Sequence, residues 1–193
     1  QSTADATDDQ LNDVSGDYVV YTAYDTVTSK SGVIMLYRIS DGRRWPLARV
    51  EVAMEPRIHG NNVVWVQGAA GASQVMWYEL GWLDTQQQAR VVAGPFPPAS
   101  QVAIGSRYIA WSQFSSGQSD IWAFDMQNPG RLQVTNTPGI DETQPATSGE
   151  WITWQRQIQH ATSIEIEAYN PATYEFRSVA LNGSYNMRPS IDG

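Results

Sequence analysis

Six polar residues recur at fixed distances before a repeated turn, and they are the best candidates for chemistry in this chain. The turn positions are Gly16, Gly60, Ser106, Gly149 and Gly193. Glu55, Gln101, Gln144 and Arg188 lie five residues before four of these turns, and Asp13 and Arg57 lie three residues before two of them. A mixture of carboxylate, amide and guanidinium groups suits a polar or zwitterionic ligand, such as a peptide terminus, a sugar or an ion, better than a strongly anionic one.

These residues can act together only if one face of a strand presents them. Side chains alternate between the two faces of a strand, so positions five and three before the turn share a face. The positions between them are mainly apolar and include Pro56, Ile58, Val102 and Val14. We therefore expect the apolar face to pack against neighbouring sheets and the polar face to line a water-filled channel. The alternative is that the polar groups only hydrate such a channel and pair with one another.

The turns recur at spacings of 44, 46, 43 and 44 residues. Each turn is followed by a β-branched and aromatic run, and the runs reach Tyr21, Trp65, Trp111 and Trp154. Two further apolar strands follow in each repeat, separated by turn residues, and no segment shows a helical period. The pattern predicts an all-β fold, a β-propeller of four-stranded antiparallel blades, with four complete repeats and the first strand of a fifth.

The repeats divide the chain into a leader and one array. Residues 1–9 are polar and acidic and are expected to form a flexible leader. Residues 10–193 form the array, with units at about 11–54, 55–100, 101–143 and 144–187 and a partial unit at 188–193. Three arrangements fit this number of repeats: a fragment of a longer propeller, a four-bladed ring with overlapping terminal strands, or two chains that complete a larger ring.

The repeats resemble those of TolB-like β-propellers of bacterial envelope and secreted proteins. The family pattern is a proline, a Ser-x-Gly turn, an apolar strand and an Ile-Tyr-x-x-Asp strand. It is matched here by Pro56, Pro145 and Pro189, by Ser15-Gly16 and Ser148-Gly149, and by residues 120–125. The resemblance covers residues 11–193 and implies a periplasmic, secreted or cell-surface protein of a bacterium. Unit one departs from the pattern at Asn12, and unit two lacks the usual aspartate.

Composition excludes several partners. The net charge is −8, with one lysine against eleven arginines, so we expect no nucleic-acid partner, which would require clustered basic residues. The chain has no cysteine and therefore no thiolate metal site or disulfide. No apolar run reaches the roughly 18 residues of a membrane span. We expect neither a membrane span nor a cofactor.

Catalytic motifs are absent from the sequence. No G-x-S-x-G nucleophile motif is present, and His59 and His160 lack the spaced partners of a zinc site. Asp13 and Glu55 on neighbouring blades could form a glycosidase-type carboxylate pair, although nothing in the sequence fixes their separation. Asp141 and Glu142 are expected to be solvated loop carboxylates near Gln144, with a cation site as the alternative.

The sequence thus favours a non-enzymatic binding or scaffold module that recognises a protein or a polysaccharide at the bacterial envelope. The alternative is the propeller domain of a hydrolase, a peptidase or glycosidase, whose active site it gates or completes. A purely structural repeat array is a third possibility. If the ring is incomplete, its unpaired strand edges also allow self-association.

Overall fold

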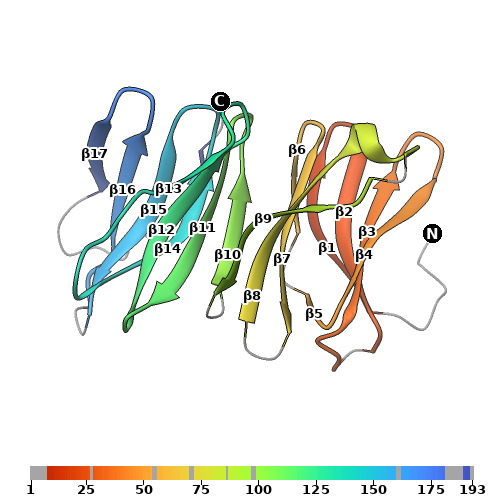
Figure 1. Cartoon of the computed structure of the whole chain (residues 1–193), viewed down its shortest axis with the longest axis horizontal. Helices are drawn as coiled ribbons and strands as arrows, with labels where there is room; N and C mark the ends of the chain where they lie inside the picture. Colours follow the sequence, from red (N-terminus) through yellow and green to blue (C-terminus); the bar gives the residue numbers. More distant parts are fainter. Residues whose placement is uncertain are drawn as a thin grey trace. The chain divides into compact units, whose positions relative to one another are not determined.

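The computed structural model describes residues 8–26, 28–53, 56–69, 72–85, 87–96, 99–159, 162–180 and 189–191. The chain divides into two compact units, residues 1–96 and 97–193. Each unit contains two antiparallel sheets, which we call blades I and II in unit 1 and blades III and IV in unit 2 (Figure 1).

Unit 1 carries the first two repeats. Blade I consists of β1 (Asp8–Ser15), β2 (Tyr18–Tyr24), β3 (Gly32–Arg38) and β4 (Arg44–Val50), paired in sequence order. Blade II consists of β5 (Val52–Ala53), β6 (Arg57–His59), β7 (Asn62–Ala69), β8 (Ala72–Glu79) and β9 (Arg90–Phe96). Both β5 and β6 pair with β7, so together they occupy the place of one first strand.

Unit 2 carries the next two repeats in the same order. Blade III consists of β10 (Ala99–Ile104), β11 (Tyr108–Ser115), β12 (Gln118–Asp125) and β13 (Gly130–Gln133). Blade IV consists of β14 (Ile140–Thr147), β15 (Ile152–Ile158), β16 (Glu165–Asn170) and β17 (Glu175–Ala180). The predicted all-β class with four four-stranded antiparallel blades is confirmed.

Helix is nearly absent from the described residues, where the one helical element is the 3₁₀ turn η1 (Leu80–Trp82). None of these residues forms a helix long and apolar enough to cross a membrane. Blade I begins earlier than the sequence suggests, because Asp8 and Asp9 of the expected leader pair with Tyr24 and Ala23 in β2. Strand pairing uses backbone groups, so acidic side chains do not prevent it at the end of a strand.

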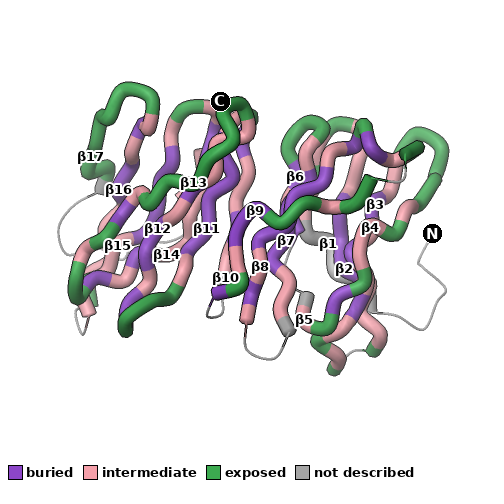
Figure 2. The backbone as a smooth tube through the Cα atoms, in the orientation of Figure 1, coloured by how far each residue is buried: buried purple, intermediate pink, exposed green. Residues whose placement is uncertain are grey.

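Each unit has its own hydrophobic core between its two blades (Figure 2). In unit 1, Val20, Ile34 and Leu36 of blade I pack with blade II residues that include Trp65. In unit 2 the corresponding core includes Ala110, Ile121 and Trp154. The three repeated tryptophans Trp65, Trp111 and Trp154 are completely buried, because the second strand of a blade is covered on both faces.

Candidate ligand-binding pocket

The structure describes four of the six polar residues predicted to form a site, while Glu55 and Arg188 lie outside the described residues. Asp13, Arg57, Gln101 and Gln144 are all half-buried. The Oδ2 atom of Asp13 accepts a hydrogen bond from the Ile58 N–H at 3.0 Å. Gln101 Oε1 accepts one from the Gln144 N–H at 2.9 Å. Each bond joins two neighbouring blades within one unit, and ligand binding by these residues stays a prediction.

The apolar side chains of the first strands are mostly placed as expected. Ile58 is 4% exposed and Val102 is 7% exposed. Val14 is the exception at 56% exposed. It pairs with Val19, whose side chain lies on the face of blade I opposite to the core residue Val20. Alternation in the sequence shows which residues share a face, but it does not show whether another element covers that face.

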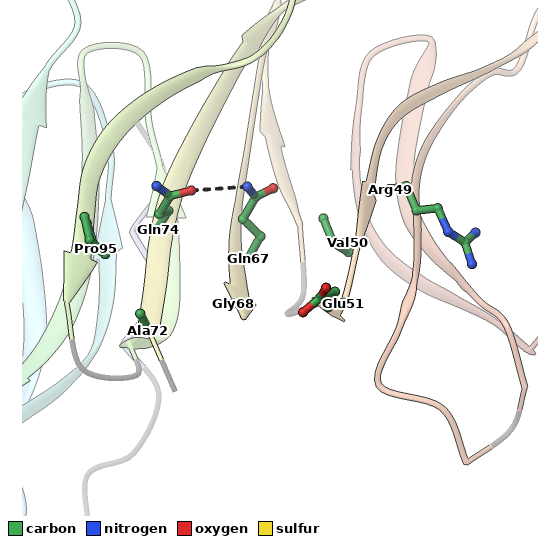
Figure 3. A pocket seen from close by; sticks show the side chains of 8 residues that line it. All are labelled: Arg49, Val50, Glu51, Gln67, Gly68, Ala72, Gln74 and Pro95. Atoms are coloured by element: carbon green, nitrogen blue, oxygen red, sulfur yellow. Dashed lines mark hydrogen bonds between the residues drawn. The ribbon is translucent and has the colours of Figure 1, made fainter. Parts of the chain in front are cut away.

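A pocket of about 390 Å³ lies in unit 1 where the end of β4 faces the β7–β8 hairpin (Figure 3). Its lining residues come from four strands and the residue after β4: Arg49, Val50, Glu51, Gln67, Gly68, Ala72, Gln74 and Pro95. Gly68 lies near the end of β7, and Pro95 lies near the end of β9.

Two glutamine amides form the polar wall of the pocket. The buried Trp65 Nε1–H donates to Gln67 Oε1 at 3.1 Å, and Gln67 Nε2 donates to Gln74 Oε1 at 3.4 Å (Figure 3). An indole nitrogen can only donate, so it fixes the orientation of Gln67 and, through Gln67, that of Gln74. The chain of hydrogen bonds therefore ends on the Gln74 NH₂ group, whose hydrogens have no acceptor among the described residues.

The two charged residues of the pocket, Arg49 and Glu51, differ in their surroundings. Arg49 pairs with Asp25 at 2.8 Å, and its guanidinium extends away from both glutamines (Figure 3). The hydrogen bond from the Ser31 hydroxyl lowers the pKa of Asp25 below its usual value. Burial opposes this shift, and the hydrogen bond and charge of Arg49 add to it. Glu51 is exposed. The pocket thus offers an amide donor, a carboxylate acceptor and apolar surface from Val50, Ala72 and Pro95.

The same cross-strand position recurs in the other blades with different chemistry. Gln67 lies opposite Gln74 in blade II, Gln113 opposite Asp120 in blade III, and Arg156 opposite Glu165 in blade IV. Trp111 Nε1 donates to Gln113 Oε1 at 3.4 Å, as Trp65 does to Gln67. The sequence signal that marks this position is Trp-x-Gln at residues 65–67 and 111–113 and Trp-x-Arg at 154–156. The sequence analysis above did not use it.

In blades III and IV, residues of these pairs form polar contacts within their own blade. Asp120 accepts a hydrogen bond from Gln118 Nε2 at 3.1 Å, and Arg156 pairs with Glu165 at 2.9 Å. In blade I the equivalent residues are Ala23 and Val33, which carry no polar side-chain groups. Blade II differs in that both residues of its pair line the pocket.

The acidic residues of β14 correct one expectation. Asp141 and Glu142 belong to a strand rather than a loop, and Glu142 is 1% exposed instead of solvated. Burial raises the pKa of Glu142 to about 7; the Thr135 hydroxyl opposes this shift and the nearby Asp120 increases it. Within the described ranges, no group of three or more histidines and carboxylates is placed to hold a metal ion.

The sequence matches no family model and no curated protein. Solved structures do show the fold. TolB from Acinetobacter baumannii has a TM-score of 0.62 and 13% identity over 85% of this chain and 41% of that one. The β-propeller domain of the trilobed protease from Pyrococcus furiosus has a TM-score of 0.66 and 13% identity over 90% of this chain and 57% of that one.

A third similar structure is a puromycin-hydrolysing peptidase of Mycobacterium tuberculosis, with a TM-score of 0.63 and 10% identity over 92% of this chain and 29% of that one. This chain therefore spans less than two thirds of each of these solved chains. At such low identity the likeness shows the fold, and it confirms the predicted propeller class.

Proposed function

We propose that the chain is a non-enzymatic β-propeller module that binds a polar ligand, a protein segment or a polysaccharide, through the pocket of unit 1. The observation that carries this proposal is the pocket itself, whose lining combines the hydrogen-bonded amides of Gln67 and Gln74 with the carboxylate of Glu51 and with apolar surface. Ligand sites typically combine apolar walls with a few polar groups, as the lining of this pocket does.

The chemistry of the lining supports binding rather than catalysis. The described lining residues include no serine, cysteine or histidine, so they supply no nucleophile and base in the arrangement that covalent catalysis needs. Glu142, the acid with a pKa near neutrality, is buried in unit 2 and does not line this pocket. The resemblance to TolB-like propellers supports a periplasmic, secreted or cell-surface location in a bacterium.

The proposal is tested by measuring binding of the whole chain to an array of oligosaccharides and short synthetic peptides. Ala72→Tyr would fill the pocket from the β7–β8 hairpin, and we expect it to abolish the array signals. Ala172→Tyr, at an exposed turn residue of unit 2, is the matched control and should leave them unchanged. Equal binding by both variants, or no binding by the unaltered chain, would contradict the proposal.

A second function is favoured by the peptidases among the similar structures. In this alternative the chain is the propeller domain of a hydrolase, a peptidase or glycosidase, and controls access to a separate active site. The complete reading frame separates the two. A G-x-S-x-G motif in an α/β-hydrolase segment of the same polypeptide would favour the hydrolase, and its absence would favour the binding module.

A further inference from the structure

We propose that the outer edge of blade IV is a self-association surface, at which β17 (Glu175–Ala180) pairs antiparallel with β17 of a second copy of this chain. This surface belongs to unit 2 and is separate from the ligand pocket of unit 1. Strand β17 is the last strand of its blade and pairs with β16 alone among the described strands. One edge of its backbone therefore carries N–H and C=O groups that have no strand partner in the described part of the chain.

The side chains of β17 and of the turn before it are largely exposed. Every residue from 172 to 179 is exposed (Figure 2). Tyr174 is 81% exposed, Val179 62% and Phe176 53%. Of the nine large apolar residues found exposed in the described structure, three thus lie within the six positions 174–179. Apolar side chains gathered on an open strand edge typically mark a contact with another chain.

The fourth strands of the other three blades carry features that oppose such pairing. β4 contains Pro46 and β9 contains Pro95, and proline has no N–H to donate to a neighbouring strand. β13 (Gly130–Gln133) is only four residues long. Prolines and short strands both protect the edge of a sheet. β17 has six residues and no proline, so its edge lacks both protections.

The polar and aromatic side chains of β17 are already held in place. Arg177 Nε donates to Glu175 Oε1 at 2.8 Å, so the two charges of the strand neutralise each other. The guanidinium carbon of Arg177 lies 5.0 Å from the centre of the Trp151 ring, and the Phe176 ring lies 6.0 Å from the ring of Trp154. A surface ordered before its partner arrives loses less side-chain entropy on association.

The order of residues in β17 favours a second copy as the partner. Paired residues of neighbouring strands lie on the same face of a sheet, so a twofold axis between two antiparallel copies must pass through a residue position. With the axis at Phe176, Glu175 of each copy lies opposite Arg177 of the other, and the two Phe176 side chains meet on one face. Val179 then lies beside the turn of the other copy, which carries the exposed Tyr174.

The neighbouring registers lose this match. An axis at Glu175 or at Arg177 places like charges directly opposite each other, which is unfavourable. An axis at Ser178 places Arg177 opposite Val179, so no pair of opposite charges forms. The register centred on Phe176 therefore pairs every charge of the strand with its opposite and covers all three exposed apolar side chains.

The test is sedimentation velocity of the whole chain at concentrations between about 0.02 and 0.5 mM. We expect an equilibrium between monomer and dimer with a Kd of about 0.3 mM or tighter, because a contact of this size lies at the weak end of protein interfaces. Arg177→Glu leaves two acidic residues on each strand, and Glu175→Arg leaves two arginines. Like charges then lie opposite each other, so we expect each variant to dimerise about tenfold more weakly or less well still.

An equal mixture of the two variants tests the register itself. Each acidic strand can then lie opposite a strand with two arginines, so we expect the mixture to form a 1:1 dimer with about the Kd of the unaltered chain. Arg131→Glu, the same charge change at an exposed residue of β13, is the control and should alter the Kd less than about twofold. Thermal unfolding checks that each variant is folded. If one is not, the double variant Glu175→Arg/Arg177→Glu exchanges the two charges within one chain and should dimerise like the unaltered protein.

Three results would overturn the inference. The first is a chain that stays monomeric over the whole concentration range, which would leave this edge to an extended segment of a different protein. The second is dimerisation that neither single variant weakens, which would place the contact on another surface. The third is dimerisation that folded variants lose and neither the mixture nor the double variant restores, which would contradict the pairing of Glu175 with Arg177.

Discussion

Glu142 shows how strongly a single position depends on its surroundings. The carboxyl group is 1% exposed, and its Oε2 atom has no hydrogen-bond partner in the described structure. Burial raises its pKa to about 7 from an ordinary value of 4.5, opposed by Thr135 and assisted by Asp120 and Glu167. Arg156 from β15 contacts Glu167 rather than Glu142 among its described ion pairs. Between about pH 4.5 and 7 the folded protein therefore holds a proton that the unfolded chain releases.

This proton makes folding stability dependent on pH. The folded pKa lies above the unfolded one, so the stabilisation is fully present below about pH 4.5 and is lost as the pH rises through about 7. The expected loss is on the order of 3 kcal/mol. Glu142→Gln cannot ionise and should remove this loss, so the variant should be more stable than the parent chain at pH 8.

The measurement is urea denaturation of both proteins at several pH values between 4.5 and 8. Other groups titrate in the same range, including Glu167, whose pKa is also raised by burial. The informative quantity is therefore the difference between the parent chain and Glu142→Gln at each pH. An identical pH dependence in the two proteins would contradict the assignment to Glu142.

At the scale of strands and turns, the molecule depends on close contacts between equivalent positions of neighbouring blades. In unit 1 the Gly60 N–H donates to the Ser15 hydroxyl at 3.0 Å, one repeat away. In unit 2 the approach is closer, because a Cβ added to Gly105 would lie 1.6 Å from the Ser148 carbonyl oxygen. Blades III and IV can therefore meet at this point only if residue 105 has no side chain.

Gly105→Ala should accordingly destabilise the protein by at least about 2 kcal/mol, because backbone must move to relieve the overlap. Gly130→Ala is the matched control. An added Cβ there meets Asn128 O at 3.6 Å, an ordinary contact, so we expect a change within about 1 kcal/mol. Chemical denaturation of both variants measures the difference. Equal free energies of unfolding for the two variants would contradict the steric role assigned to Gly105.

Prediction from sequence succeeded best at this scale. Each second strand follows its predicted turn, because β2, β7, β11 and β15 begin two or three residues after Gly16, Gly60, Ser106 and Gly149. Alternating apolar residues and turn residues are local signals, so each repeat carries the information for its own strands. The Trp-x-Gln motif is visible in the sequence as a repeat. The role of its glutamine can be inferred only once the third-strand residue that pairs with it is known.

At the scale of the whole molecule, the net charge of −8 sets the conditions for binding. A neutral ligand has no long-range interaction with this charge, so its affinity should hardly depend on ionic strength. For a neutral oligosaccharide identified on the array, we expect the Kd to change less than about twofold between roughly 0.05 and 0.5 M salt. Calorimetric titrations at the two salt concentrations measure it, and a change of about tenfold would indicate a charged contact with the ligand.

The sequence by itself determined the all-β class, the four-stranded repeats and their order, and the tertiary structure decided where a ligand could bind. The pocket combines Glu51, which follows β4, with Gln74 of β8 and Pro95 of β9, and no spacing in the sequence brings these residues together. The burial of Glu142 was equally hidden, since β14 sets its position and the elements around it exclude water. Strand pattern is a property of neighbouring residues, whereas burial, pKa and pocket shape are properties of surfaces that meet only after folding.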